Sequence, residues 1–336
     1  MAAFLEAKAL SRQFAPRLSV GDHIAAMFGS AVETRAVRAV DDVSLSLARG
    51  ETLGLVGESG CGKSTLGRMI AGILPPTRGA VTLEGAPVMS GRRKTTTRIQ
   101  TVFQDPFASL DPRMRIGATI AEGPLAHGLV GRAEAPVFVR AWLKTVGLDP
   151  DYAERYPHQF SGGQRQRVAI ARALAMAPDV VVCDEPVASL DVSIQAQIIN
   201  LFLRLRGELR LTMLFISHDL GVVRHLCDRV AVMYLGHVVE MGSCAQIYRV
   251  PRHPYTHALI SAVPKLKAGR SEFTPIAGEI PSPLDPPPGC VFHPRCPLAV
   301  ERCRRERPAP RMVGDRLVAC HRAEEMPAAA MRAAQA

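Results

Sequence analysis

The chain contains three short runs of consecutive apolar residues, and each run ends at a polar or glycine-rich stretch. The runs are Leu53 to Val56, Val180 to Cys183 and Leu214 to Ile216. Continuous apolar runs of this length are typical of strands buried on both faces, as in parallel sheets. Between the second and third runs, apolar residues recur at helical spacing from Ile194 to Leu205, after a candidate cap at Asp191. Strands that alternate with helices predict an α/β domain with a parallel sheet.

The remaining pattern predicts further strands and a helical insertion. Prolines at 106, 112, 124 and 136 separate helical pieces, of which Val137 to Val146 is the clearest. Residues 15 to 38 read as an irregular insertion after the first strand. The further predicted strands are Leu5 to Phe14, Val43 to Leu47, Val81 to Gly85, Ile99 to Gln104, and a hairpin of Arg229 to Tyr234 with His237 to Met241.

The composition changes near Pro251. Prolines are dense from there to Pro288, and four cysteines follow, at positions 290, 296, 303 and 320. The last residues, Met326 to Ala336, are rich in alanine. We therefore predict a large domain over residues 1–250 with a helical subdomain over about 105–175, a small irregular cysteine-bearing domain over 251–325 and a disordered tail over 326–336.

The overall composition narrows the class of protein. Of the 336 residues, 47% are hydrophobic, which is enough for a sizeable core. The formal net charge is +10, so we expect an anionic partner, and an anionic membrane surface fits better than nucleic acid because no basic patch is interleaved with aromatic residues. No apolar run approaches the roughly 20 residues that span a bilayer, and Met1 to Glu6 does not look like a signal peptide. We expect a cytosolic protein, whose eight cysteines are thiols or metal ligands.

The first apolar run leads into a phosphate-binding loop, G-x-x-x-x-G-K-[ST]. A glycine-rich turn between a strand and a helix lets backbone N–H groups surround phosphate oxygens at the positive end of the helix. Lys63 would reach the β- and γ-phosphates, and the Ser64 hydroxyl would bind Mg²⁺. The residues of this loop are Gly57, Glu58, Ser59, Gly60, Cys61, Gly62, Lys63, Ser64 and Thr65.

Two further stretches carry candidate chemistry. Asp184 ends the second apolar run, where an Mg²⁺ partner is expected downstream of a phosphate loop, and the adjacent Glu185 could take a proton from attacking water. Ser161, Gly162, Gly163 and Gln164 open a helix and form a second candidate anion site. A single nucleotide does not need two such sites. One explanation is a head-to-tail dimer, in which the second site of each chain covers the γ-phosphate bound by the other chain. A plain helix cap is the alternative for this stretch.

The order of these motifs resembles the nucleotide-binding subunits of ABC transporters over about residues 5 to 250. The corresponding segments are Phe14 (adenine-stacking aromatic), Phe103-Gln104-Asp105-Pro106 (Q-loop), Ser161 to Gln164 (signature), Asp184-Glu185 (Walker B), Ala188 to Asp191 (D-loop) and His218 (switch histidine). The resemblance implies a P-loop NTPase core with a helical subdomain. It also implies ATP and Mg²⁺ as ligands and Glu185 as the general base. Gln104 would contact the Mg²⁺ together with Ser64 and Asp184 and would sense the attacking water, and His218 would contact the γ-phosphate.

Three more segments are similar to the oligopeptide and dipeptide permease ATPases. They are Val102 to Met114, Tyr156 to Phe160 and His253 to Thr256, and the cysteine-bearing C-terminus agrees with them. The early insertion and Arg113-Met114 resemble the F-type partner of the two ATPases in that system. The resemblance implies a peripheral ATPase on the cytoplasmic face of the membrane, with a related ATPase subunit, two membrane permease subunits and a substrate-binding protein as partners.

The spacing of Cys290, Cys296, Cys303 and Cys320 differs from the usual paired C-x₂-C pattern of zinc sites. Some peptide permease ATPases hold a 4Fe–4S cluster here, which four cysteines would suit. Zinc or free thiols are the alternatives, with His293 and His321 as substitutes or neighbours.

The candidate cargoes are dipeptides, longer peptides, nickel chelates and glutathione. The candidate assemblies are a homodimer and a heterodimer. A non-transport ABC ATPase is the alternative class. A GTPase is disfavoured, since Asn200 is followed by Leu201 and not by the Asn-Lys-x-Asp motif.

Overall fold

The structure is a computed structural model that describes residues 3–15, 36–262 and 278–326. Most of the predicted insertion at 15–38, and the predicted tail after residue 326, lie outside the described residues.

An eight-stranded sheet runs through the molecule in the order β13-β14-β12-β11-β3-β10-β9-β8. The five strands from β11 to β8 in this order are parallel, and β12, β14 and β13 are antiparallel to their neighbours. The bounds are β3 Thr52–Val56, β8 Ile99–Val102, β9 Val180–Asp184, β10 Thr212–Ile216, β11 Arg229–Tyr234, β12 His237–Ser243, β13 Arg311–Val313 and β14 Arg316–Val318.

The three apolar runs of the sequence form the centre of this sheet. Every residue of β3, β9 and β10 is buried, as expected for strands that are covered on both faces. The predicted hairpin is also present, as the antiparallel pair of β11 and β12. The prediction of an α/β core with a parallel sheet is therefore confirmed.

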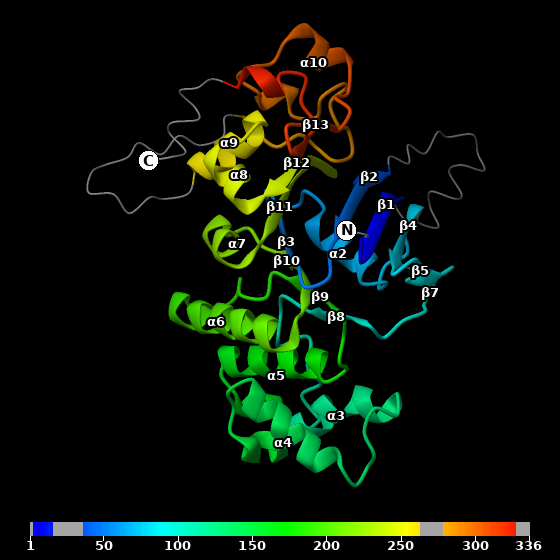
Figure 1. Cartoon of the computed structure of the whole chain (residues 1–336), viewed down its shortest axis with the longest axis vertical. Coiled ribbons are helices and arrows are strands. Elements are labelled where there is room, and N and C mark those ends of the chain that lie inside the picture. Colours follow the sequence, from blue (N-terminus) through cyan, green and yellow to red (C-terminus); the bar gives the residue numbers. More distant parts are fainter. Residues whose placement is uncertain (1–2, 16–35, 263–277, 327–336) are drawn as a thin grey trace, which may run out of the picture.

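A second, antiparallel sheet lies beside the first, with the order β2-β1-β4-β5. Figure 1 shows its strands next to α2, the helix that follows the phosphate loop. Its strands are β1 Leu5–Phe14, β2 Val37–Leu47, β4 Arg78–Leu83 and β5 Ala86–Pro87, and a small ribbon follows, β6 Met89–Ser90 with β7 Arg93–Lys94.

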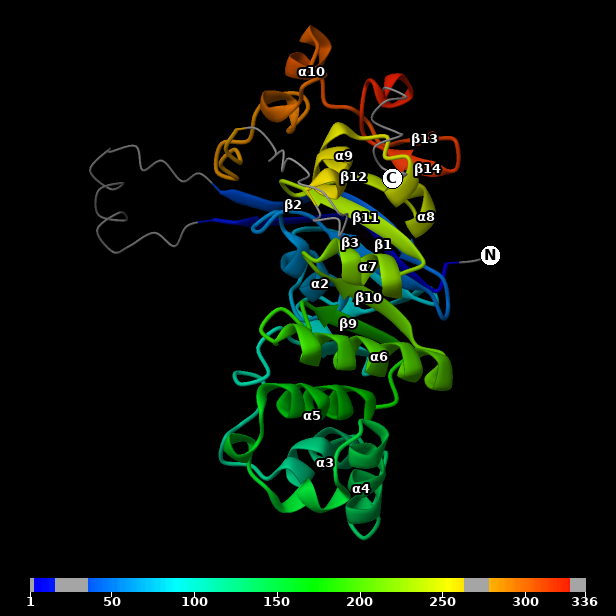
Figure 2. The ribbon, with the colours of Figure 1, turned by 90° about the vertical axis from the view of Figure 1, so that its left-hand side faces the viewer.

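Helix α2 packs closely on the central strands because Gly67 has no side chain. A Cβ atom at Gly67 would lie 2.5 Å from the Cδ1 atom of Ile216 on β10. Helices α5 and α6 form a layer below the sheet, and α3 and α4 lie beyond α5 (Figures 1 and 2). The bounds of these helices and of α7 are α2 Lys63–Ile70, α3 Ile116–Ala126, α4 Ala135–Thr145, α5 Gly162–Leu174, α6 Val192–Leu209 and α7 Leu220–Leu226.

The helical insertion contains one departure from the expected pattern. Pro124 lies inside α3 and does not separate two helical pieces, so that part of the prediction is wrong. The position is tolerated because it falls in the last turn of the helix, where the missing N–H removes a single intrahelical hydrogen bond.

The C-terminal region lies at the opposite end of the molecule from α3 and α4 (Figure 1). Its strand β14 extends the main sheet by pairing with β12, with Val318 opposite Glu240. Arg316 forms an ion pair with Glu240, which is fully buried. The helices of this end are α8 Cys244–Arg249, α9 Pro254–Ser261 and α10 Glu301–Arg305.

Candidate functional site

The phosphate loop connects the carboxyl end of β3 to the start of α2. Its Lys63 is buried, and the Nζ atom donates to the carbonyl oxygens of Gly57 at 2.8 Å and Glu58 at 3.0 Å. Two glycines are required by close backbone contacts. A Cβ at Gly57 would lie 2.1 Å from the carbonyl oxygen of Met233, and one at Gly62, with φ +105°, would lie 2.1 Å from that of Ala39. The loop is therefore held in one compact shape by its glycines and its lysine.

Two predicted oxygen ligands of Mg²⁺ meet at the start of α2. The Ser64 hydroxyl donates to Oδ1 of Asp184 at 2.7 Å, although Ser64 lies in α2 and Asp184 ends β9. Burial raises the pKa of Asp184, and the hydrogen bond from Ser64 opposes this shift. A hydroxyl and a carboxylate are oxygen donors of the kind that Mg²⁺ prefers beside a phosphate. The donor set therefore fits the predicted ion.

Glu185 follows Asp184 in an uncommon backbone conformation. Its φ is +48°, in the left-handed region, and its N–H donates to the carbonyl of Ile216 on β10. Its Oε2 atom lies 3.1 Å from Nδ1 of His218. Strain of this kind persists where the surrounding structure fixes the residue, often at active sites. The structure thus brings together the two residues predicted to act on the attacking water and the γ-phosphate.

Gln104 lies in an exposed loop after β8. Its carbonyl oxygen accepts a hydrogen bond of 3.5 Å from the hydroxyl of Ser189, which belongs to the segment after Glu185. Nearby, the guanidinium of Arg165 lies over the exposed ring of Phe107, with its Cζ atom 3.8 Å from the ring centroid. The Q-loop is therefore in contact with the segment that follows Walker B, and the residue directly after the Q-loop is in contact with α5.

Ser161 caps α5 in a reciprocal arrangement. The N–H of Gln164 donates to the Ser161 hydroxyl at 3.4 Å, and the N–H of Ser161 donates to Oε1 of Gln164 at 3.0 Å. Gly162 and Gly163 form the first turn. Helix α5 lies well apart from α2 in both views, so one chain does not bring the signature segment onto its own phosphate loop (Figures 1 and 2). Phe14, at the end of β1, is 39% exposed and lies under the guanidinium of Arg12.

Two residues at the phosphate loop were not among the predicted site residues. The Tyr255 hydroxyl oxygen accepts the backbone N–H of Glu58 at 2.9 Å. The guanidinium of Arg295 donates two hydrogen bonds to the Glu58 carboxylate, at 2.7 and 3.0 Å. Arg295 is 237 positions from its partner, and no local pattern in the sequence links the two.

The four late cysteines line one small cavity, together with His293 and His321. Burial raises the pKa of each of the thiols of Cys290, Cys296 and Cys320 to about 11. The kind and number of donors fit a four-thiolate centre. Among the described residues, however, no group of three or more His, Cys, Asp or Glu side chains is arranged to hold a metal ion.

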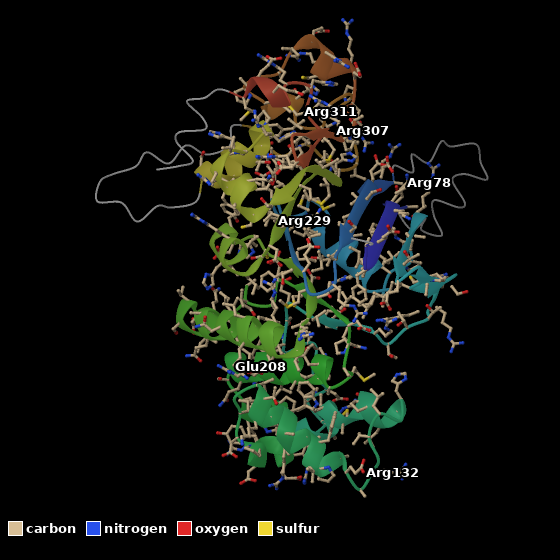
Figure 3. The ribbon with its side chains drawn as sticks, viewed as in Figure 1. Arg78, Arg132, Glu208, Arg229, Arg307 and Arg311 are labelled. Atoms are coloured by element: carbon tan, nitrogen blue, oxygen red, sulfur yellow. The ribbon has the colours of Figure 1, made fainter. Side chains whose placement is uncertain are left out.

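The basic side chains are spread over the molecule and many are paired. Figure 3 shows Arg132 at the end formed by α3 and α4, Arg78 on the antiparallel sheet, and Arg307 at the C-terminal end. Arg307 contacts the Asp41 carboxylate at 3.1 Å, and Arg229 contacts that of Glu51 at 2.9 Å. In the described parts of the chain, no helix is both long and apolar enough to cross a membrane.

The sheet order, the helical layer and the phosphate loop beside Asp184 and Glu185 define an ATPase of the ATP-binding cassette class. Two solved structures support this fold. The protein cbiO1 from Clostridium perfringens, part of the ABC transporter complex cbiONQ, is 28% identical, with a TM-score of 0.59 over 74% of this chain and 91% of that one. The ATP-binding cassette MJ0796, solved as a dimer bound to ADP and Pi, is 27% identical, with a TM-score of 0.59 over 71% and 98%.

Sequence comparison gives the family within this class. Residues 40–188 match the family described as ABC transporter, and residues 239–303 match the family described as oligopeptide/dipeptide transporter, C-terminal region. The di/tripeptide transport ATP-binding protein DppF of Pseudomonas aeruginosa is 50% identical over 86% of this chain and 91% of that protein. The chain belongs to the ABC transporter family of ATPases and carries the oligopeptide/dipeptide transporter C-terminal region. The predicted family is thereby confirmed.

Proposed function

We propose that this chain binds and hydrolyses ATP to drive peptide import through a binding-protein-dependent ABC transporter. The observation that carries the proposal is the match of residues 239–303 to the oligopeptide/dipeptide transporter C-terminal region, which stands beside a complete phosphate-loop site. The 50% identity to a di/tripeptide transport ATP-binding protein supports the same cargo class. Nickel or glutathione import is the second candidate, and a non-transport ABC ATPase is the third.

The predicted site residues have distinct roles in ATP binding and hydrolysis. Lys63 and the loop backbone bind the β- and γ-phosphates, and Ser64 and Asp184 hold Mg²⁺. When bound, Mg²⁺ neutralises charge that develops on the phosphate oxygens. Glu185 accepts a proton from the attacking water, and His218, in contact with that carboxylate, holds its orientation and reaches the γ-phosphate.

A second ATPase chain completes the site. Ser161 and the α5 N-terminus lie away from the phosphate loop of their own chain, so in a head-to-tail dimer they can act on the nucleotide of the partner. Gln104, in its exposed loop, passes dimer closure to the two membrane permease subunits, which receive cargo from a substrate-binding protein. The F-type resemblance favours a related ATPase as the partner, on the cytoplasmic face of the membrane.

The cysteine-lined cavity is proposed as the site of a 4Fe–4S cluster held by Cys290, Cys296, Cys303 and Cys320. The proposal is supported by the four thiols that share one cavity. Such a cluster would tie together the irregular backbone around these residues. Protein purified without oxygen should contain about four irons per chain and absorb visible light. Iron-free, colourless protein would contradict the cluster, and zinc in its place would support the alternative.

The transport function is tested on the complex extracted intact from its membrane. ATPase activity is measured with the binding protein empty, loaded with a mixture of short peptides, loaded with a nickel chelate, or loaded with glutathione. Stimulation by the peptide-loaded form alone is expected. Stimulation by nickel or glutathione would move the assignment to that cargo. ATPase activity that ignores every loaded binding protein, or a chain recovered without membrane subunits, would favour a non-transport ATPase.

A further inference from the structure

Glu58, the second residue of the phosphate loop, is held at three separate groups. Its N–H donates to Tyr255, its carbonyl oxygen accepts from Lys63, and its carboxylate accepts two bonds from Arg295. Two of these three partners come from the region after residue 250. Glu58 is thus fixed by the C-terminal region as well as by the loop itself.

The contact between Arg295 and Glu58 is largely buried beside a cluster of aromatic rings. Arg295 is 8% exposed, and its guanidinium is near the ring of Tyr234. The rings of Tyr234, Tyr255 and Phe292 pack against one another with centroids 4.6 to 5.4 Å apart. The hydrogen bond to Glu58 is the largest cause that raises the pKa of Arg295. A bidentate pair that is shielded from water is both strong and specific in its geometry.

We propose that Arg295, assisted by Tyr255, is a positioning residue for the phosphate loop, so that docking of the C-terminal region sets the affinity of the site for ATP. The proposal rests on the nucleotide-binding function proposed above. If Glu58 shifts, its carbonyl oxygen moves away from Lys63, the side chain that is to bind the phosphates. The loop N–H groups that must point at phosphate oxygens move with the same backbone.

The position of Arg295 is in turn tied to the cysteine-lined cavity. Arg295 lies in the short 3₁₀ turn His293–Arg295, which is flanked in the chain by Cys290 and Cys296. The N–H of Arg295 donates to Phe292 at 3.0 Å, and that of Cys296 donates to His293 at 3.3 Å. This short turn therefore connects the cavity to the phosphate loop.

The test measures ATP binding by the purified full chain, using displacement of a fluorescent ATP analogue, which needs no hydrolysis. Arg295→Ala should weaken ATP binding about tenfold or more, equivalent to about 1.4 kcal/mol. Arg295→Lys should recover part of the affinity, since it restores the charge without the bidentate geometry. The matched control is Arg302→Ala, which removes an exposed arginine that pairs with Glu306 in the same region and should leave the affinity unchanged.

A double-mutant cycle separates positioning from general damage. If the two side chains act through one contact, Arg295→Ala and Glu58→Gln together should weaken binding no more than the worse single variant. If Arg295→Ala does not fold, Tyr255→Phe serves in its place, because it keeps the ring and removes the oxygen that accepts the Glu58 N–H, and it should weaken binding several-fold. A purely structural role would lower the melting temperature and leave the dissociation constant of folded protein unchanged.

Two outcomes distinguish a failure of the proposed function from a failure of the positioning role. Wild-type protein that binds no nucleotide would contradict the proposed function itself. Wild-type protein that binds ATP, with folded Arg295→Ala and Tyr255→Phe variants within twofold of its affinity, would overturn the positioning role and leave the ATPase assignment standing.

Discussion

The substitution Glu185→Gln should separate ATP binding from ATP hydrolysis. Glutamine has the shape of glutamate, so the amide can keep the 3.1 Å contact with His218 and the backbone can keep its φ of +48°. The charge of Glu185 is one of the causes that raise the pKa of Asp184, so its removal favours the ionised form of Asp184. The proposed Mg²⁺ ligands and the phosphate loop should therefore remain able to bind MgATP.

The magnitude follows from the role of the lost carboxylate. A positioned general base contributes about 10² to 10⁴ in rate. Glu185→Gln should lower kcat by that factor, which corresponds to a barrier higher by about 2.7 to 5.5 kcal/mol. The dissociation constant for ATP should stay within about twofold of wild type, because the residues that hold the phosphates are unchanged.

The assay is phosphate release under saturating ATP, with ATP binding measured separately on the same protein. The control is Glu208→Gln, which removes an exposed carboxylate on α6 that pairs with Arg204 and should leave turnover unchanged. ATP-loaded Glu185→Gln protein should also accumulate as a dimer in size-exclusion chromatography. Turnover within tenfold of wild type would refute the general-base role of Glu185.

Three further changes test other parts of the structure. Gly62→Ala should abolish ATP binding, since the added Cβ would lie 2.1 Å from a backbone oxygen in a residue with φ +105°; isothermal titration measures this. His253→Asn should remove a pH dependence of stability: burial lowers the pKa of His253 to about 3, so the folded state excludes a proton that the unfolded state binds. The wild-type free energy of unfolding should therefore fall relative to the variant by up to about 1.4 kcal/mol per pH unit from pH 6 to 4, in urea titrations. Arg316→Met should cost about 3 to 5 kcal/mol in the same measurement, because it leaves the buried carboxylate of Glu240 without its ion-pair partner.

Each of these changes has its own control. Gly85→Ala lies outside the loop at a similar φ of +80° with no atom within 4 Å, so it should cost only conformational strain and retain binding. For His253→Asn, the asparagine oxygen can still accept the hydrogen bond that the Tyr255 N–H donates to His253, so the difference in unfolding free energy between the two proteins should be constant above pH 7. Equal slopes below pH 6 would contradict the buried neutral histidine. For Arg316→Met, the paired substitution with Glu240→Gln should recover most of the loss, and a loss below 1 kcal/mol would contradict the buried pair.

The parts of the fold that the sequence predicted well are those with a local cause. A strand buried on both faces needs an uninterrupted apolar run, and β3, β9 and β10 are such runs. A phosphate loop needs glycines where the backbone closes on its neighbours, and these have a recognisable spacing. Because parallel strands end at one edge, Asp184 could be placed near Ser64 before the structure was known.

The contacts that the sequence did not predict join distant segments through single side chains. Tyr255 and Arg295 meet Glu58 across 197 and 237 positions, and neither belongs to a periodic pattern. The left-handed backbone of Glu185 was also not predictable, since glutamate rarely adopts it and the conformation is imposed by neighbouring strands. Such features depend on the assembled tertiary structure, and local propensity contains no signal for them.

The C-terminal region shows why this distinction matters for function. From its prolines and cysteines we expected an irregular region that a metal centre would tie together. In the structure, Phe292 is fully buried against Tyr234 and Tyr255, and β14 pairs with β12. Burial of one such aromatic side chain contributes about 1.5 to 3 kcal/mol, and both attachments are made by residues other than the cysteines. A chain that loses a metal centre should therefore stay docked, so that any influence of the cysteines on ATP binding has to act through the local geometry of the turn that carries Arg295.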